Sequence, residues 1–174
     1  KSPLMIVGGG GWDEPSCQKL QSFAEINNLP VGCSFRCQDY FDNRHPNYVG
    51  HIGIGLSNSL KDRIQNSDLL VVVGARLGEI TTSGYSLLEI PKPKQQLIHV
   101  HAGAEELGSV YQADLPINAS PRSFIDSVSQ LKVSGSSQWT ASTKLGNSDY
   151  LETLVPKAIP GDVQMGQIAC WLNE

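Results

Sequence analysis

The sequence predicts an α/β domain: a Rossmann-like parallel sheet of about five to six strands with helices on both faces. Two observations support this class. Short apolar runs that suit buried strands alternate along the chain with segments whose apolar residues recur at helical spacing. The strongest run, Leu69 to Val73, is apolar throughout, which is typical of a strand buried on both faces of a parallel sheet.

The first strand, helix and second strand follow one another through short connections. Pro3 to Val7 is an apolar run that ends in the tight glycine turn Gly8 to Gly11. Asp13 is suited to cap the helix that follows, and the asparagines at 27 and 28 end it. Leu29 to Ser34 is then predicted as the second strand.

The middle of the chain holds the longest irregular stretch. Residues 35 to 55 show no clear periodicity and suggest a functional loop. Leu56, Leu60 and Ile64 share one helix face, with Ser57 near the cap. The strand Leu69 to Val73 comes next and stops at Gly74.

Two more strands complete the predicted sheet. Leu97 to His101 is the fourth strand, and a short helix is expected near residues 104 to 110. Leu115 to Asn118 is the fifth strand. A last helix begins at Ser120-Pro121, and its inward residues are predicted to be Phe124, Val128 and Leu131.

The sequence predicts three parts. Residues 1–132 form the central α/β domain. Residues 133–160, rich in Ser, Gly and Thr, are expected to be a linker, although Trp139 suits docking on the domain. Residues 161–174 carry a new helical pattern and are interpreted as the start of a truncated further domain.

Composition excludes several classes. The 174 residues carry a net charge of −4 without a basic cluster, which argues against a nucleic-acid partner. The apolar runs are too short to cross a bilayer, and no signal peptide is evident, so we expect a cytoplasmic protein. The four cysteines lack zinc-site spacing and suit reduced thiols; they are Cys17, Cys33, Cys37 and Cys170. His99 and His101 share a strand face, but no carboxylate spacing supports a metal site.

Candidate ligand residues lie where the strands end, because parallel sheets bind ligands at their carboxyl edge. Glycines let backbone N–H groups approach a phosphate, and Arg76 adds charged donors. The turn departs from the dinucleotide motif, since Asp13 stands where Gly or Ala is expected. From spacing alone, Gly8 to Gly11 are therefore interpreted first as a turn that only redirects the chain. No nucleophile motif is evident, and we assign no catalytic residue.

Four segments resemble, in family order, the central domain of acetolactate synthase-like, thiamine-diphosphate-dependent enzymes. They are Leu4 to Gly10, His45 to Gly53, Asp68 to Glu79 and Leu97 to His101. The segment Asp68 to Glu79, DLLVVVGARLGE, is the most specific of them. Residues 163–168 resemble the first helix of the family's diphosphate-binding domain.

The resemblance implies a role inside a larger enzyme. Such enzymes combine pyrimidine-binding, central and diphosphate-binding domains, form dimers or tetramers, and hold thiamine diphosphate and Mg²⁺ between the outer two domains. They are transferases or lyases that act on 2-keto acids or related carbonyl compounds. The activating Glu and the metal motif of the family are absent from these residues, so the fragment itself is expected to be inactive.

Some relatives bind FAD or ADP in the central domain, and others bind nothing there. Carried over from them, the candidate cofactor-binding residues are Gly8, Gly9, Gly10, Ser34, Phe35, Gly50, His51, Gly74, Ala75 and Arg76. The sequence departs from the flavin-binding pattern at three places. His51 lies one position earlier than the histidine of that pattern, Gly78 to Ile80 replace its Asp-Asp-Arg, and His101 replaces its acidic residue. Three hypotheses result: a scaffold domain of a carboligase or decarboxylase; as the main alternative, a stand-alone FAD- or ADP-binding module; and a purely structural dimerisation unit.

Overall fold

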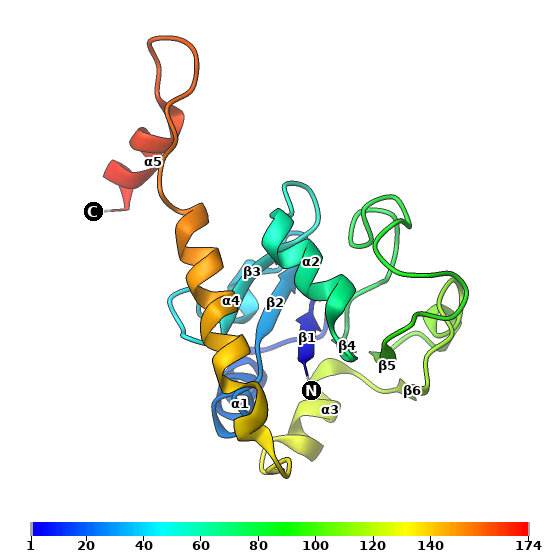
Figure 1. Cartoon of the computed structure of the whole chain (residues 1–174). Helices are drawn as coiled ribbons and strands as arrows, with labels where there is room; N and C mark the ends of the chain where they lie inside the picture. Colours follow the sequence, from blue (N-terminus) through cyan, green and yellow to red (C-terminus); the bar gives the residue numbers. More distant parts are fainter. Residues whose placement is uncertain (1, 174) are drawn as a thin grey trace.

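A six-stranded parallel sheet forms the centre of the molecule (Figure 1), as seen in a computed structural model that describes residues 2–173. Its strands are β1 (Pro3–Val7), β2 (Val31–Ser34), β3 (Tyr48–Ile52), β4 (Leu69–Val73), β5 (Gln96–His101) and β6 (Leu115–Asn118). They lie in the order β3-β2-β1-β4-β5-β6, and every neighbouring pair is parallel. The predicted Rossmann-like class is therefore confirmed.

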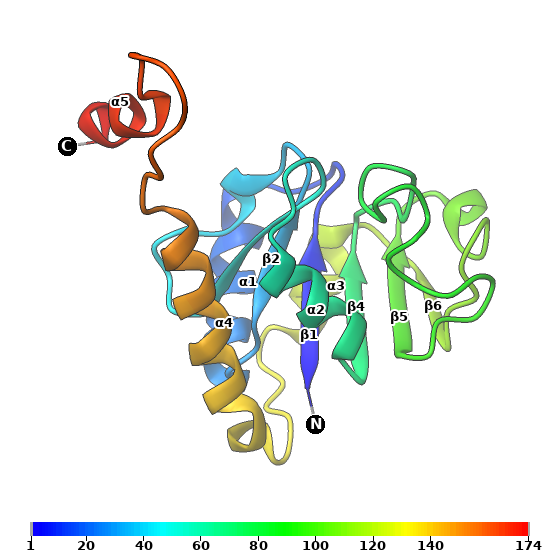
Figure 2. The same cartoon turned by 45° about the horizontal axis from the view of Figure 1, so that its top comes forward.

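Helices cover both faces of the sheet, as predicted. The helices are α1 (Glu14–Asn27), α2 (Asn58–Asn66), α3 (Pro121–Val128), α4 (Thr140–Thr153) and α5 (Met165–Leu172). Successive residues of a strand point to opposite faces. Val71 and Val73 accordingly pack with α1 and α3, whereas Leu70 and Val72 pack with α2. The helices α1 and α3 lie on one face of the sheet and α2 on the other (Figure 2).

Local sequence explains where the first helices begin. Asp13 caps α1 in a capping box with Ser16, and Asn28, in the left-handed conformation at φ 51°, ends the helix. Ser57 caps α2, and Ser120 caps α3. The predicted helix starts are confirmed, because each depends on a side chain that bonds to a backbone N–H group in its own first turn.

Two local predictions are wrong, and a third is met only in part. The stretch 35–55 contains strand β3 and a 3₁₀ turn, Gln38–Tyr40, because pairing with β2 extends a segment that no alternation marks. Near residues 104 to 110 only the short 3₁₀ turn Ala104–Glu106 forms. Leu131 is exposed, because α3 ends before it, and Ile125 is the buried residue instead.

The expected linker 133–160 is largely structured. It holds the 3₁₀ turn Ser136–Trp139 and the whole of α4, which packs along the edge strand β3. Its small residues serve packing: a Cβ on Gly146 would lie 2.9 Å from Val49 Cγ1. Asn147 Nδ2 donates to the carbonyl of Tyr48 at 2.9 Å. A composition typical of linkers therefore covers the open edge of the sheet here.

Helix α5 lies apart from the sheet (Figures 1 and 2). None of its residues is buried, and Trp171 is 62% exposed. The helical pattern predicted after residue 161 is thus observed, whereas its assignment to a further domain stays a prediction. Residue 174 lies outside the described part of the chain.

Candidate functional site

The strand order places a topological switch point between β1 and β4. Their ends lie side by side, with Val7 paired to Val73. Ligands of doubly wound sheets bind in the crevice outside these carboxyl ends, because the chain leaves the two strands toward opposite faces. The predicted segments Gly8 to Gly11 and Gly74 to Arg76 meet at this point.

The glycines at the switch point pack against one another. A Cβ on Gly8 would lie 1.8 Å from Ser34 Oγ, and one on Gly9 would lie 1.9 Å from the Gly74 carbonyl oxygen. Gly9 also has φ +70°, a conformation that side chains other than glycine rarely adopt. Gly10 is exposed and has no neighbour within 4 Å of a Cβ. Gly8, Gly9 and Gly74 thus let the ends of neighbouring strands approach one another closely.

An aromatic pair covers the glycine turn. Trp12 Nε1 donates to the Gly8 carbonyl at 2.9 Å, and the Tyr40 hydroxyl donates to the Gly9 carbonyl at 2.7 Å. The two rings lie 5.6 Å apart. These side chains hold the turn in place and occupy surface beside it.

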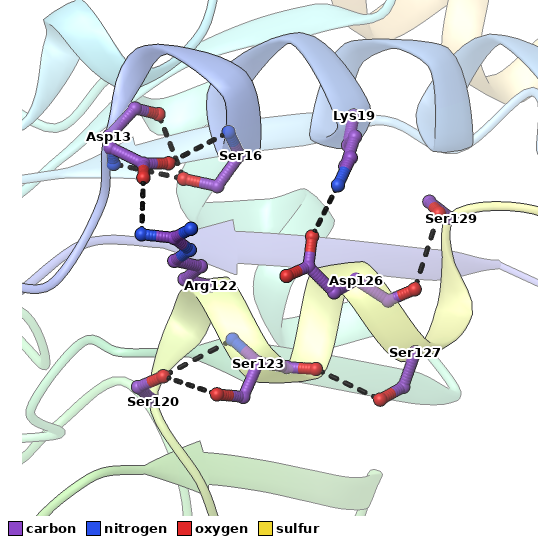
Figure 3. Close-up of polar contacts among 9 residues, drawn as sticks. All are labelled: Asp13, Ser16, Lys19, Ser120, Arg122, Ser123, Asp126, Ser127 and Ser129. Atoms are coloured by element: carbon purple, nitrogen blue, oxygen red, sulfur yellow. Dashed lines mark hydrogen bonds and ion pairs between the residues drawn. The ribbon is translucent and has the colours of Figure 1, made fainter.

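The N-terminus of α1 is filled by the chain's own carboxylate (Figure 3). Asp13 Oδ1 accepts from the Ser16 backbone N–H at 3.0 Å, and Oδ2 pairs with Arg122 Nη1 of α3 at 3.0 Å. Hydrogen bonding by Ser16, helped by the charge of Arg122, lowers the pKa of Asp13 from its ordinary value. In this fold class a phosphate usually binds at this helix end. The negative charge of Asp13 repels such a ligand here.

Arg76 reaches the rim of the crevice but already has a partner. Its Nε donates to Glu106 Oε2 at 2.8 Å, and its side chain is 74% exposed. The preceding Ala75 is buried, and its carbonyl accepts from His99 Nε2 at 3.0 Å. Burial lowers the pKa of His99, which favours the neutral ring. These groups therefore stabilise the end of β4.

His101 does not complete a metal site with His99. Their rings lie 6.1 Å apart, and His101 Nδ1 accepts from the Gly103 N–H at 3.1 Å. Within residues 2–173, no group of three His, Cys, Asp or Glu side chains is placed to hold a metal ion.

The remaining candidate residues lie away from the switch point. Gly50 and His51 are inside the edge strand β3, which β2 separates from β1. His51 Nε2 lies 3.0 Å from the Ile54 carbonyl, within its own turn. Phe35 packs beside Gly53 and under the guanidinium of Arg36, 5.1 Å from its ring centre.

The structure therefore brings half of the predicted residues together. Those at the switch point are Gly8, Gly9, Ser34, Gly74 and Ala75, with Gly10 and Arg76 at its exposed rim. Sequence reasoning missed Trp12, Tyr40, Glu106 and Arg122. Trp12 directly follows the glycines and could have been noticed, whereas the other three come from segments that only the fold brings to the crevice.

Comparison with known proteins points to one family. The family model described as thiamine pyrophosphate enzyme, central domain, matches residues 1–128. The acetolactate synthase large subunit of Corynebacterium glutamicum is 27% identical over 125 residues, 72% of this chain and 20% of that protein. The acetolactate synthase isozyme 3 large subunit of Escherichia coli is 24% identical over 91% of this chain and 30% of that protein.

The chain thus corresponds to a fifth to three tenths of the length of these two relatives. No helix within residues 2–173 is long and apolar enough to span a membrane.

Proposed function

The chain belongs to the family of thiamine pyrophosphate enzyme central domains, and we propose that it is the central scaffold domain of a larger thiamine-diphosphate-dependent enzyme that resembles acetolactate synthase. That enzyme would be a transferase or lyase acting on 2-keto acids or related carbonyl compounds. It would work in the cytoplasm as a homodimer or homotetramer.

The packing and charge at the switch point between β1 and β4 support the scaffold role. Gly9 and Gly74 approach so closely that no side chain fits between them. Asp13 occupies the helix end where a phosphate would bind. The close glycine contacts and the Asp13–Arg122 ion pair hold two strands and two helices together at this point. The domain therefore supports its neighbours structurally.

Thiamine diphosphate and Mg²⁺ would be held by a pyrimidine-binding domain and a diphosphate-binding domain elsewhere in the same protein. The described residues of this chain do not fit the metal, because they offer no group of three suitable ligands. We assign them no catalytic step. The cofactor performs the chemistry in enzymes of this kind, and the protein orients it.

Turnover by the full-length protein tests the proposal. With thiamine diphosphate, Mg²⁺ and pyruvate or another 2-keto acid, it should release carbon dioxide and form a decarboxylated or carboligated product. Omitting thiamine diphosphate should abolish this activity, and the 174-residue chain alone should show none. A full-length protein without turnover of any 2-keto acid, aldehyde or acyl-CoA thioester would contradict the assignment.

The alternative, a stand-alone module that binds FAD or ADP, predicts a functional nucleotide site at the same crevice. Calorimetric titration of the chain with FAD, and separately with ADP, distinguishes the two hypotheses. We expect no heat with either ligand, because Asp13 repels the diphosphate and Glu106 already engages Arg76. Micromolar binding that is lost in Arg76→Ala would instead favour the nucleotide-binding module.

A further inference from the structure

A second hollow lies at the opposite, amino-terminal edge of the sheet. We call it the amino-edge cavity; it encloses about 470 Å³. Its lining residues are Pro3, Met5, Phe23, Leu29, Asp68, Leu69, Val71, Gln96, Ile98, Phe124, Val133, Ser134 and Trp139. Pro3, Leu69 and Gln96 are the first residues of β1, β4 and β5, so the cavity opens at the ends of these strands opposite to the glycine turns.

The short length of α3 explains why the hollow exists. The helix starts after β6, and its eight residues extend about 12 Å. The six residues of β5 extend about 20 Å. α3 therefore leaves the amino-terminal ends of β4 and β5 uncovered on this face, and the connection from α3 to α4 passes beyond them (Figure 2). Val133 and Ser134 of that connection form the outer wall.

The inner walls are apolar and firmly held. Met5 and Val71 are buried in the sheet, and Phe23 projects from α1. Trp139 is 5% exposed, and its Nε1 donates to the Asn27 carbonyl at 2.9 Å. Leu69, Ile98 and Phe124 are only partly buried, so the cavity opens to solvent. Fixed apolar walls with an open mouth are typical of small-molecule sites.

The polar groups at the rim disfavour a negatively charged ligand. They are Asp68, Gln96 and Ser134, and among residues 2–173 no Lys, Arg or His lines the cavity. Asp68 Oδ1 accepts from the Ser2 backbone N–H at 3.0 Å, and its second oxygen takes part in no hydrogen bond within residues 2–173. The Asp68 carboxylate at the rim disfavours anions and can accept a hydrogen bond from a ligand donor.

We propose that the amino-edge cavity binds a small molecule that combines an aromatic or branched apolar body with one hydrogen-bond donor and no negative charge. Its volume lies in the range of about 300 to 1,000 Å³ that ligand sites occupy. It is about three times the volume of an apolar protein cavity of about 150 Å³ that binds benzene. The ligand class excludes 2-keto acids and nucleotides, which are anions, so this site is independent of the proposed thiamine chemistry.

Three probes that share one ring test the charge preference. Ligand-observed NMR titrations of the full-length protein compare benzyl alcohol, benzylamine and benzoate. Benzyl alcohol and benzylamine should bind, and benzoate should bind at least tenfold more weakly. Asp68→Asn should weaken benzylamine severalfold while leaving benzyl alcohol unchanged. Equal binding of all three probes, or no binding of any because another part of the protein covers the cavity, overturns the proposal.

Filling the cavity tests the location. Ile98→Trp should abolish binding of benzyl alcohol, because the new ring enters the space that the probe needs. Leu115→Trp is the matched control: Leu115 pairs with Ile98 across β5 and β6 but does not line the cavity. Leu69→Phe provides a second filling variant should Ile98→Trp fail to fold. Binding that survives in the folded filling variants refutes the assignment.

Discussion

Trp139 provides a direct test of whether the segment 133–160 belongs to the folded unit. The side chain is 5% exposed within the core that α1 and α3 form on the sheet, and its indole donates to the Asn27 carbonyl. Trp139→Ala should therefore lower the free energy of unfolding by about 3–5 kcal/mol through lost packing. The unpaired Asn27 carbonyl adds on the order of 1 kcal/mol. Trp139→Phe, which keeps a ring but no donor, should cost about 1–2 kcal/mol.

Urea denaturation of the 174-residue chain, followed by circular dichroism, measures these losses. Trp171→Ala is the matched control, because Trp171 is 62% exposed on α5 and should change the unfolding free energy by less than about 0.5 kcal/mol. The slope of free energy against urea should stay constant, so that midpoints report stability alone. If Trp139→Ala costs no more than Trp171→Ala, then α4 does not stabilise the domain and 133–160 behaves as the linker that its composition predicts.

Three further predictions concern the carboxyl edge of the sheet and the buried titratable groups. Gly9→Ala should lower the free energy of unfolding by about 2 kcal/mol or more, because the new Cβ would meet the Gly74 carbonyl and the φ of this residue is positive. Gly10→Ala should leave it nearly unchanged, and the urea midpoints of the two variants test the difference. Burial lowers the pKa of His99 below 6.5, so the unfolded chain takes up its proton first. The free energy of unfolding should therefore fall as the pH drops below about 6.5. His99→Gln should remove this part of the pH dependence, and a variant with an unchanged pH dependence would contradict the role given to His99. Burial raises the pKa of Cys33 to about 12, so this thiol should resist a disulfide reagent at about pH 8 until the chain unfolds, as mass spectrometry of the labelled protein can establish.

Local signals predicted much of the fold correctly. The apolar run 69–73 and the cap at Asp13 both depend on residues close in sequence, so their structures follow from the chain itself. Strand β3 was missed because its stability comes from pairing with β2 and from α4 packing outside it. Helix α4 was missed for the same reason, because its stability comes from tertiary contacts. Its Ser, Thr and Gly residues are typical of a linker, but in the fold Gly146 packs against Val49.

The candidate site divides in the same way. Residues close together in the sequence were enough to predict a parallel sheet with glycine turns at its carboxyl edge, because strand pattern and turn chemistry act over a few residues. What those turns do became visible in the folded molecule: Gly74 closes on Gly9, and Arg122 and Glu106 arrive from distant segments to pair with Asp13 and Arg76. Packing and charge between distant elements set how closely these groups approach, and neither has a local sequence signature.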